Sequence, residues 1–492
     1  MKILYRNLRN SQAELQKLFS EMKRTPSEEE QMLLKRAYFF AEKAHDGQKR
    51  FSGEPYFNHV YATALNLAGF GADAETIAAG FLHDTLEDTE TTKEELRDLF
   101  GEKILFLVEG VTKLGTYRYQ GVKRHTESLR KLFIASSKDI RVLIIKFADR
   151  LHNVSTLRYV RKDKQKRIAM ETLEIYAPLA NRLGMGKLKG ELEEYSFPFA
   201  YPEEYEEVKK LLKQKSKAGE KPLQKVYRTL KQKLAEDGLK DAQTSKRIKG
   251  VYSLYKKLLR HDMDIDKVYD LIAIRVIVNS VEDCYRVLGI VHGLWRPLPG
   301  RIKDYIATPK PNGYQSIHTN IFIGDGGVIE IQIRTQKMHE EAEYGIASHT
   351  LYKEGLGRKK GDQLKKNLLW IEELVERQKN VEESGVFLEN LKTDFFEDRI
   401  FVFTPKNDVI DLPEGSSPID LAYSIHSDIG DHIVGAKING KFLSIDTKLK
   451  NGDIVEVITK RNARPTEKWM KSTKTALAQR HIRSALQHQK AH

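Results

Sequence analysis

A short stretch in the middle of the chain combines cations, an aromatic ring and turn residues. It is the segment 300–320, GRIKDYIATPKPNGYQSIHTN. The cations are Arg301, Lys303 and Lys310, which suit phosphate groups, and the ring of Tyr314 suits a base. Prolines, an asparagine and a glycine force a tight turn before His318, which follows on an emerging strand. The stretch predicts a substrate-binding surface, although a solvated loop with incidental lysines has a similar composition.

Two predicted strands flank this stretch. KVYDLIAIRVIV, with Asp270 near its start, is almost continuously apolar, whereas VIEIQIRT alternates with period two. The alternation places Glu330, Gln332 and Arg334 on one face of the strand. If the strands are neighbours, Asp270 and Glu330 can share magnesium, which takes one or two carboxylates together with phosphate oxygens. This layout is typical of nucleotidyl transfer.

A second chemical cluster lies in the region 27–197, where the pattern is helical throughout. His83 and Asp84 are adjacent, and Glu87 and Asp88 follow four residues later. On one continuous helix, His83 stacks over Glu87 and Asp84 over Asp88. The sequence therefore predicts an all-α domain that presents two tiers of ionisable side chains.

His59 and Asp149, brought in from other helices, complete the upper tier. With the His-Asp pair they offer two imidazoles and two carboxylates, a set that suits manganese, iron or zinc. The lower tier can move protons or act on an attacking water. Each residue alone also has an ordinary explanation, since single histidines are often structural and acidic runs usually face water. The combination favours a metal site.

Composition limits the class of protein. The 492 residues are 40% hydrophobic, enough for two to four domains with cores. A net charge of +14 favours polyanionic partners, either nucleotides or RNA. The single cysteine, Cys284, excludes an internal disulfide framework and a multi-cysteine zinc site. Without a signal-peptide pattern or a run of about 18 apolar residues, the sequence predicts a cytoplasmic protein with no membrane partner.

Three groups of motifs resemble known families. YDLIAIRVIV, the 300–320 stretch, EIQIRT and AEYGIASH, in this order, resemble the synthetase domain of the RelA/SpoT family, whose members make (p)ppGpp. His59, the His83-Asp84 pair and Asp149 in ADRLHN resemble the HD phosphohydrolase superfamily, with flanking segments similar to the hydrolase half of RelA/SpoT proteins. The segment from DRIFVF to DIVEVIT resembles a TGS domain, which in long RelA/SpoT proteins contacts uncharged tRNA.

The resemblance implies a multidomain fold. An all-α HD-type hydrolase domain is expected at 1–197, and an α+β, nucleotidyltransferase-like synthetase domain with a mixed sheet at 198–349. The synthetase range includes a charged helical connector, which the charge pattern predicts to be a solvated helix pair. A helical linker is expected at 350–393, a small β-grasp TGS domain at 394–460, and the start of a further, truncated helical region at 461–492.

In the hydrolase domain, the resemblance implies manganese at four ligands: His59, His83, Asp84 and Asp149. Glu87 and Asp88 are then expected to act on the attacking water. Arg50 matches an arginine that engages substrate, and Asn153 and Thr156 match positions that line the guanosine pocket.

In the family's synthetase reaction, the 3′ hydroxyl of GDP or GTP attacks the β-phosphorus of ATP, so that pyrophosphate moves and AMP leaves. The resemblance implies that Asp270 binds magnesium, that Glu330 helps to bind it or deprotonates the hydroxyl, and that Tyr314 stacks on guanine beside His318. The other implied substrate contacts are Arg247, Lys249, Ser253, Lys257, Lys303, Lys310, Gln332 and Arg334.

The quartet 301–304 has the RXKD form that accompanies bifunctional members of the family. The sequence therefore predicts a bifunctional (p)ppGpp synthetase and hydrolase with ATP, GDP or GTP and (p)ppGpp as ligands. Ribosomes and uncharged tRNA are expected partners through the TGS domain, although Asp431 stands where a histidine is usual and His432 is displaced by one residue. Two alternatives stay open: a chain with one live active site, or a ribosome- or tRNA-binding regulator whose enzyme modules sense nucleotides.

Overall fold

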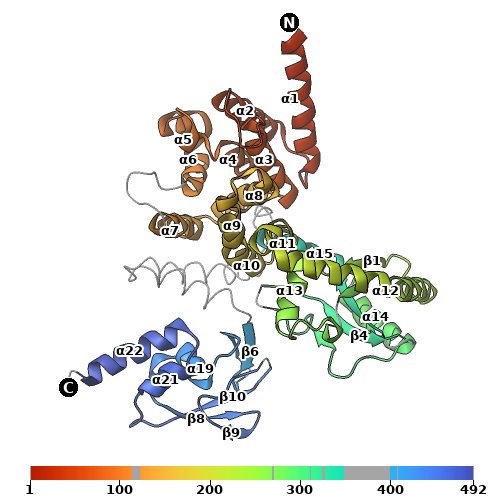
Figure 1. Ribbon diagram of the computed structural model, residues 1–492, viewed down its shortest axis with the longest axis vertical. Helices are drawn as coiled ribbons and strands as arrows, with labels where there is room; N and C mark the ends of the chain where they lie inside the picture. Colours follow the sequence, from red (N-terminus) through yellow and green to blue (C-terminus); the bar gives the residue numbers. More distant parts are fainter. Residues whose placement is uncertain are drawn as a thin grey trace. The chain divides into compact units, whose positions relative to one another are not determined.

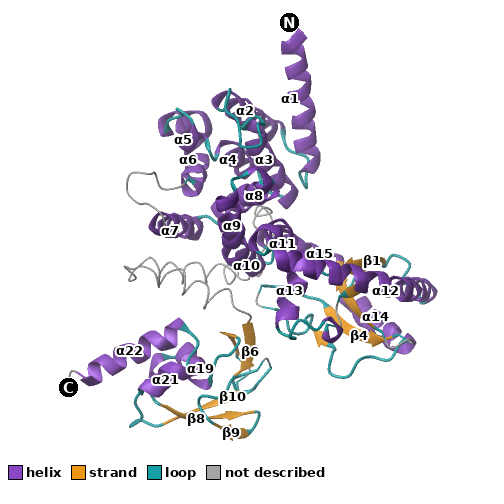
Figure 2. Cartoon of the chain, viewed as in Figure 1, coloured by secondary structure: helices purple, strands orange, loops and turns teal. Residues whose placement is uncertain are grey.

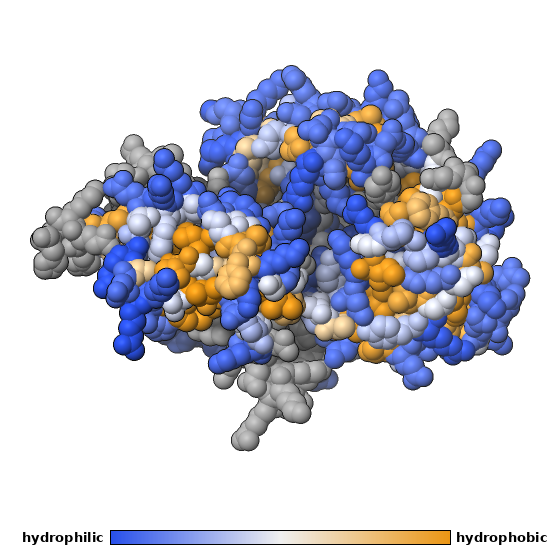
Figure 3. All heavy atoms as spheres, turned by 90° about the horizontal axis from the view of Figure 1, so that it is seen from below, coloured by the Kyte–Doolittle hydropathy of each residue, from blue (hydrophilic) through white to orange (hydrophobic). Residues whose placement is uncertain are grey.

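The computed structural model describes residues 2–112, 122–268, 271–310, 312–323, 327–347, 399–406, 408–450 and 452–490. These residues form two compact units, one within 1–376 and the other within 377–492 (Figure 1). Asp270 and the expected helical linker at 350–393 lie outside the described residues. None of the described helices is both long and apolar enough to span a bilayer. The face drawn in Figure 3 is mostly hydrophilic, with apolar patches between the charged side chains.

The first part of the first unit is all helical, as predicted (Figure 2). Its α-helices are α1 (Lys2–Glu21), α2 (Glu28–Ala44), α3 (Phe57–Phe70), α4 (Ala74–Leu82), α5 (Thr85–Asp88), α6 (Lys93–Val111), α7 (Val122–Lys138), α8 (Arg141–Ser155), α9 (Lys162–Glu171), α10 (Ala177–Arg182) and α11 (Gly186–Ala200). A 3₁₀ turn covers Leu157–Tyr159 and a π-helical turn Thr172–Tyr176.

Local sequence explains where several of these helices begin and which one is central. Ser27 caps α2 in a capping box with Glu30, and Asp73 accepts a hydrogen bond from the backbone of Thr76 at the start of α4. Every residue from Val142 to Asp149 in α8 is buried. A helix that is apolar nearly all round belongs in a core, and α8 packs against α3, α4, α6, α7 and α11.

The prediction of one continuous helix through the His-Asp pair is wrong. α4 ends at Leu82 and α5 begins at Thr85, so His83 and Asp84 lie in the turn between the two helices. The Thr85 hydroxyl donates to the Leu82 carbonyl at 2.7 Å and competes with the backbone ladder at this point. Helical spacing persists one turn later, because the Asp88 N–H still donates to the Asp84 carbonyl at 2.9 Å.

The rest of the first unit has a mixed sheet with helices, as predicted. Its elements are α12 (Pro202–Glu236), β1 (Gln243–Ile248), α13 (Val251–Leu259), a 3₁₀ turn (Ile265–Lys267), β2 (Ile272–Val278), α14 (Val281–Leu294), β3 (Lys303–Asp304), β4 (Ile317–Phe322), β5 (Val328–Thr335) and α15 (Gln336–Tyr344). The strand order is β1-β2-β5-β4-β3. β2 and β5 are parallel neighbours with Ala273 opposite Glu330, so the two strands predicted to share a site do lie side by side.

The prediction of a solvated helix pair before this sheet is wrong. α12 is one helix of 35 residues. In its C-terminal half, Leu223, Val226, Leu230 and Leu234 are buried in the same core as the apolar residues of β2, β4 and β5. Their spacing of three and four residues forms one apolar stripe, so this half of α12 belongs to the sheet domain.

The second unit has small sheets around a helix, consistent with the expected β-grasp fold. Its elements are β6 (Arg399–Phe403), β7 (Val409–Pro413), α19 (Pro418–Ile425), α20 (Ser427–Asp431), β8 (Ile433–Ile438), β9 (Lys441–Leu443), β10 (Val455–Thr459), α21 (Glu467–Ser472) and α22 (Ala476–Lys490). The sheets have the orders β10-β8-β9 and β6-β7. Trp469 and Ile482, from α21 and α22, are buried against Ile419 and Tyr423 of α19. The two last helices therefore share a core with the strands and helix before them.

One buried carboxylate joins α19 to the turn between α21 and α22. Asp420, fully buried, accepts hydrogen bonds from the backbone N–H groups of Ser417 at 2.8 Å, Lys474 at 2.9 Å and Thr475 at 2.8 Å. The hydroxyl groups of Ser417 and Thr475 also donate to it, at 3.1 and 2.9 Å. Asp420 is thus the main polar contact between these segments.

We expect Asp420→Ala to destabilise the second unit by on the order of 3 kcal/mol or more, because each buried donor left without an acceptor costs about 1–3 kcal/mol. Hydrogen–deuterium exchange of the full chain should show faster exchange in α19, α21 and α22. Asp420→Asn keeps one acceptor oxygen and should have a smaller effect. Unchanged exchange in Asp420→Ala would show that these contacts do not hold the helices together.

Candidate active sites

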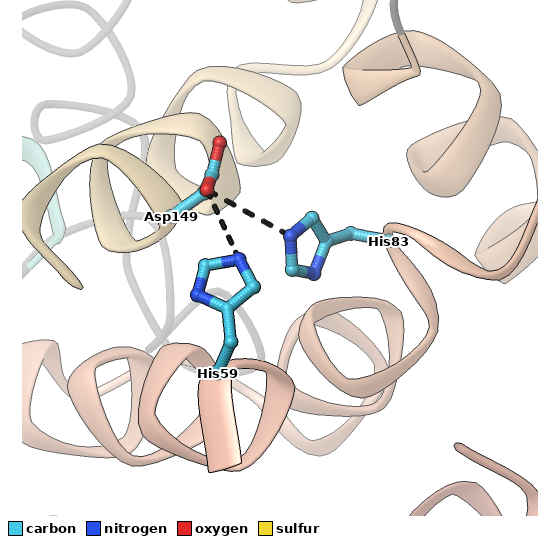
Figure 4. A group of neighbouring side chains, drawn as sticks. All are labelled: His59, His83 and Asp149. Carbon is cyan, nitrogen blue, oxygen red and sulfur yellow. Dashed lines mark ion pairs between the residues drawn. The ribbon is translucent and has the colours of Figure 1, made fainter. Parts of the chain in front are cut away.

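The four predicted metal ligands converge in the helical domain. His59 comes from α3, His83 and Asp84 from the turn after α4, and Asp149 from α8. Figure 4 shows His59, His83 and Asp149 pointing toward one another. His59 Nε2 lies 3.3 Å from Asp149 Oδ1 and 3.4 Å from Asp84 Oδ2, and His83 Nε2 lies 3.1 Å from Asp84 Oδ2. His59, His83 and Asp149 each offer one ligand atom, and these three atoms all lie within 4.8 Å of one another.

The proton positions at His83 fit a divalent cation. His83 Nδ1 lies 2.8 Å from the Gly80 carbonyl, which can only accept, so Nδ1 carries the proton. In the neutral ring Nε2 is then bare. This buried atom has no hydrogen-bond partner in the described part of the chain, and it faces the carboxylates of Asp84 and Asp149. The repulsion between this lone pair and the carboxylates is relieved either by a proton on Nε2, since, against the effect of its burial, Asp84 and Asp149 raise the pKa of His83, or by a divalent cation between the ligands, so the donor set fits a divalent metal ion.

Both carboxylates are held in their ionised form. Burial opposes ionisation of Asp84, but the imidazoles of His83 and His59, in their protonated form, lower its pKa well below the usual range. Burial likewise opposes ionisation of Asp149, and Lys146 and the imidazoles lower its pKa well below the usual range. Lys146 Nζ donates to Asp149 Oδ2 at 2.8 Å. The site therefore offers two anionic ligands at neutral pH.

The lower tier is connected to the ligands through a tyrosine that sequence reasoning missed. The Tyr56 hydroxyl lies 2.8 Å from both Asp84 Oδ2 and Asp88 Oδ2, and the ring of His45 stacks on Tyr56 with centroids 4.8 Å apart. Asp88 and Glu87 are both exposed. The available signal was that Tyr56 precedes His59 by three residues, which places it one turn away at the start of α3.

A cavity of about 640 Å³ adjoins the metal ligands. Of the predicted residues it is lined by Arg50, Glu87, Asp149 and Asn153, whereas the Thr156 hydroxyl donates to the His152 carbonyl at 3.0 Å and does not line it. Its wall also contains four cations that sequence reasoning did not single out: Lys146, Arg150, Lys164 and Arg167. Glu171 also lines the cavity and pairs with Arg150 at 2.6 Å, so the cavity combines a metal site with a wall in which cations outnumber carboxylates.

A second cavity, of about 430 Å³, lies in the sheet domain. It brings together ten predicted residues of the 300–320 stretch, α13 and the strands: Arg247, Lys249, Ser253, Lys257, Arg301, Lys303, Lys310, His318, Glu330 and Gln332. His261, Lys267, Tyr305 and Asn320 also line it and were missed. Among its described lining residues are seven lysines and arginines and one carboxylate, Glu330. This charge distribution suits a polyphosphate.

Glu330 lies at the centre of a hydrogen-bonded chain. His318 Nδ1 lies 2.9 Å from Glu330 Oε1, and the Gln332 amide donates to Oε2 at 2.7 Å. The Tyr314 hydroxyl lies 2.8 Å from His318 Nε2, and Arg247 donates to Gln332 Oε1 at 3.2 Å. These contacts orient the carboxylate, which the parallel pairing of β5 with β2 places next to the strand that follows Asp270.

Tyr314 and Arg334 lie outside the lining of this cavity. Arg334 is only 1% exposed, and its guanidinium contacts Glu343 Oε1 at 3.0 Å. It therefore lies on the expected face of β5 but is buried behind the cavity. Tyr314 reaches the cavity indirectly, through the hydrogen bond from its hydroxyl to His318.

Lys310 is the most perturbed cation of the cavity. Its Nζ lies 4.6 Å from the ring centroid of Tyr305 and 5.2 Å from that of Tyr314. Burial, reinforced by the nearby charge of Lys303, lowers the pKa of Lys310 to about 8. Its charge is therefore sensitive to pH in the range where enzymes are assayed.

Three family models match the chain in succession. An HD domain matches residues 37–186, a region found in RelA / SpoT proteins matches 246–357, and a TGS domain matches 400–459. The HD match agrees with a dependence on a divalent metal ion, for which the structure offers His59, His83 and Asp149.

Curated relatives match almost the whole chain. A guanosine-3′,5′-bis(diphosphate) 3′-pyrophosphohydrolase of Aquifex aeolicus is 47% identical over 93% of the chain and 65% of its own length. A GTP pyrophosphokinase of Myxococcus xanthus is 46% identical over 93% of the chain and 60% of its own length. The bifunctional (p)ppGpp synthase/hydrolase SpoT of Escherichia coli is 42% identical over 93% of the chain and 65% of its own length. The chain thus spans less than two thirds of these relatives. The three domain models match successive segments of the chain, and the relatives match nearly its whole length. The chain therefore belongs to the RelA/SpoT family.

Proposed function

We propose that the chain catalyses two opposed reactions in the cytoplasm. In one, pyrophosphate is transferred from ATP to the 3′ oxygen of GDP or GTP, giving (p)ppGpp and AMP. In the other, (p)ppGpp is hydrolysed to GDP or GTP and pyrophosphate. The observation that carries this proposal is the presence, in one compact unit, of two cavities with opposite electrostatic needs: one built around a metal-ligand set and one around a single carboxylate among cations.

For hydrolysis, we propose manganese as the ion held by His59, His83, Asp84 and Asp149. Manganese bound there would supply Lewis acidity at the 3′ phosphoryl group. Arg50 and the cationic wall would hold the phosphates and the guanosine would lie near Asn153. Glu87 and Asp88 would take the proton of the attacking water, while the 3′ oxygen leaves from phosphorus and is protonated. The Tyr56 hydroxyl, which lies 2.8 Å from both carboxylates and can donate its one proton to either, supports this role by joining the two tiers.

For synthesis, we propose that Glu330 and Asp270 hold magnesium, which would neutralise charge on the ATP phosphates. Glu330 would also accept the proton of the 3′ hydroxyl, whose oxygen bonds to the β-phosphorus as AMP leaves. The cations of the cavity would stabilise the phosphates, with Ser253 and Lys257 on the side of ATP. Tyr314 would stack on guanine, and its hydrogen bond to His318 supports a position beside Glu330.

Ribosomes and uncharged tRNA are proposed partners of the second unit. Asp431, at the position where the family usually has histidine, accepts a hydrogen bond from the Tyr423 hydroxyl at 2.8 Å. This carboxylate is engaged within its own unit, so we propose that contact with RNA depends on neighbouring side chains such as His432, whose imidazole contacts Arg464 at 3.0 Å.

The two activities should separate by mutation. We expect Glu330→Gln to reduce synthesis by about 10²-fold or more, because it removes the only described carboxylate of that cavity, and to leave hydrolysis unchanged. Asp84→Asn should do the reverse. Synthesis assayed with ATP and GDP, and hydrolysis assayed with ppGpp, make each variant the control for the other. Loss of both activities in a folded single variant would contradict the assignment of two sites.

The pKa of Lys310 predicts an alkaline limit for synthesis. Below about pH 8 its side chain is charged and can bind phosphate; above that pH the charged fraction falls about tenfold per unit. We therefore expect the KM for nucleotide in synthesis to rise above about pH 8. Lys310→Arg keeps the charge and should lack this rise, while hydrolysis serves as an internal control. The same alkaline rise in Lys310→Arg would assign it to another group.

A further inference from the structure

We infer that His152 is a positioning residue of the metal site, which fixes the ligand His59 in its metal-binding tautomer and joins it to Arg50. The inference deepens the proposed hydrolase function and rests on it. His152 lies in α8, three residues after the ligand Asp149. It belongs to the ADRLHN segment but was not among the residues predicted from the sequence.

One nitrogen of His152 meets two neighbours. His152 Nδ1 lies 2.9 Å from the guanidinium NH1 of Arg50 and 2.8 Å from His59 Nδ1. The rings of His59 and His152 have centroids 5.0 Å apart. His59 and His152 come from different helices, α3 and α8, and Arg50 lies in the loop before α3. His152 is therefore the point where these three segments meet.

The chemistry of the partners decides where the protons lie. A guanidinium can only donate, so His152 Nδ1 must accept the hydrogen bond from Arg50 and carries no proton. His59 Nδ1, at 2.8 Å from this unprotonated nitrogen, must then carry a proton itself, because two lone pairs at that distance repel. The neutral His59 ring is left with a bare Nε2, the atom that faces Asp84 and Asp149. His152 thus does for His59 what the Gly80 carbonyl does for His83.

A second branch reaches the other side of the site. The same Arg50 guanidinium donates through NH2 to Asn153 Oδ1 at 2.6 Å, and the Asn153 amide donates to Asp149 Oδ1 at 2.5 Å. His59 Nε2 and Asp149 Oδ1, 3.3 Å apart, complete the ring. Adjacent residues of α8 therefore connect one arginine to two metal ligands. The position of the arginine that would hold substrate is tied to the geometry of the ligands.

The test measures metal binding directly in the full chain after removal of metal with a chelator. Manganese is titrated and the free ion is followed by electron paramagnetic resonance. His152→Leu removes the acceptor and should weaken manganese binding about 10- to 100-fold, the usual effect of losing a hydrogen-bond partner of a ligand. His152→Asn is the matched variant: its side-chain oxygen replaces Nδ1 as acceptor and should restore most of the affinity. Circular dichroism of the metal-free proteins checks that all three are folded.

A kinetic readout separates positioning from general damage. At saturating manganese, His152→Leu should raise the KM for ppGpp, because Arg50 loses one of its two anchors, and His152→Asn should not. Equal manganese affinity in the wild type and His152→Leu, or equal loss in His152→Leu and His152→Asn, would overturn the inference. If the wild-type chain itself bound no manganese, the proposed metal-dependent hydrolysis would fail instead.

Discussion

Concentration of like charges beside an apolar core is the constraint on which both cavities depend. In the helical domain two ionised carboxylates face two imidazole nitrogens, and in the sheet domain seven cations surround one carboxylate. The first arrangement therefore suits an added cation, and the second suits an added polyanion. The protein can maintain such arrangements only because the ligand-bearing side chains are fixed by elements with large apolar cores. Each site is thus suited to a ligand whose charge is opposite to the charge that the fold concentrates there.

Rigid elements supply that fixation. α8 carries Asp149 in a run of buried residues that is apolar apart from its partner Lys146, so the ligand cannot move without disturbing the core. β5 does the same for Glu330, because the strand lies between β2 and β4 and its isoleucines fill the core on the opposite face. In both cases a single element is apolar on the faces that anchor it and polar where it meets the cavity.

Much of this could be predicted from sequence because the signals are local. The period-two alternation of VIEIQIRT correctly placed Glu330 and Gln332 on one face, and the identities of His59, His83 and Asp149 indicated a metal site. The break between α4 and α5 was missed because no proline or glycine lies between Leu82 and Thr85. The hydrogen bond from the Thr85 hydroxyl to the Leu82 carbonyl is the local feature that accompanies the break. The burial of α12 was missed because lysines and glutamates surround its apolar stripe. Tyr56 and His152 were missed because their roles depend on partners that only the tertiary fold brings near.

The two domains of the first unit also meet through the backbone, at a point close to the predicted guanine contact. The Ile346 N–H donates to the Leu183 carbonyl at 2.9 Å, and a Cβ added to Gly345 would lie 2.1 Å from that carbonyl oxygen. With φ at +53°, Gly345 also has a conformation that other residues rarely adopt, so the close approach requires glycine.

Asn312 extends this contact to the substrate loop. Its amide donates to the Asn181 carbonyl at the end of α10 at 2.9 Å, and its Oδ1 accepts the N–H of Tyr314 at 3.2 Å. A single side chain thus joins the end of α10 to the residue proposed to stack on guanine. Because the hydrogen bonds on both sides of Asn312 involve backbone groups, displacement of the turn between α10 and α11 must strain the loop that carries Tyr314. Asn312 therefore links the backbone of α10 directly to the loop that carries Tyr314.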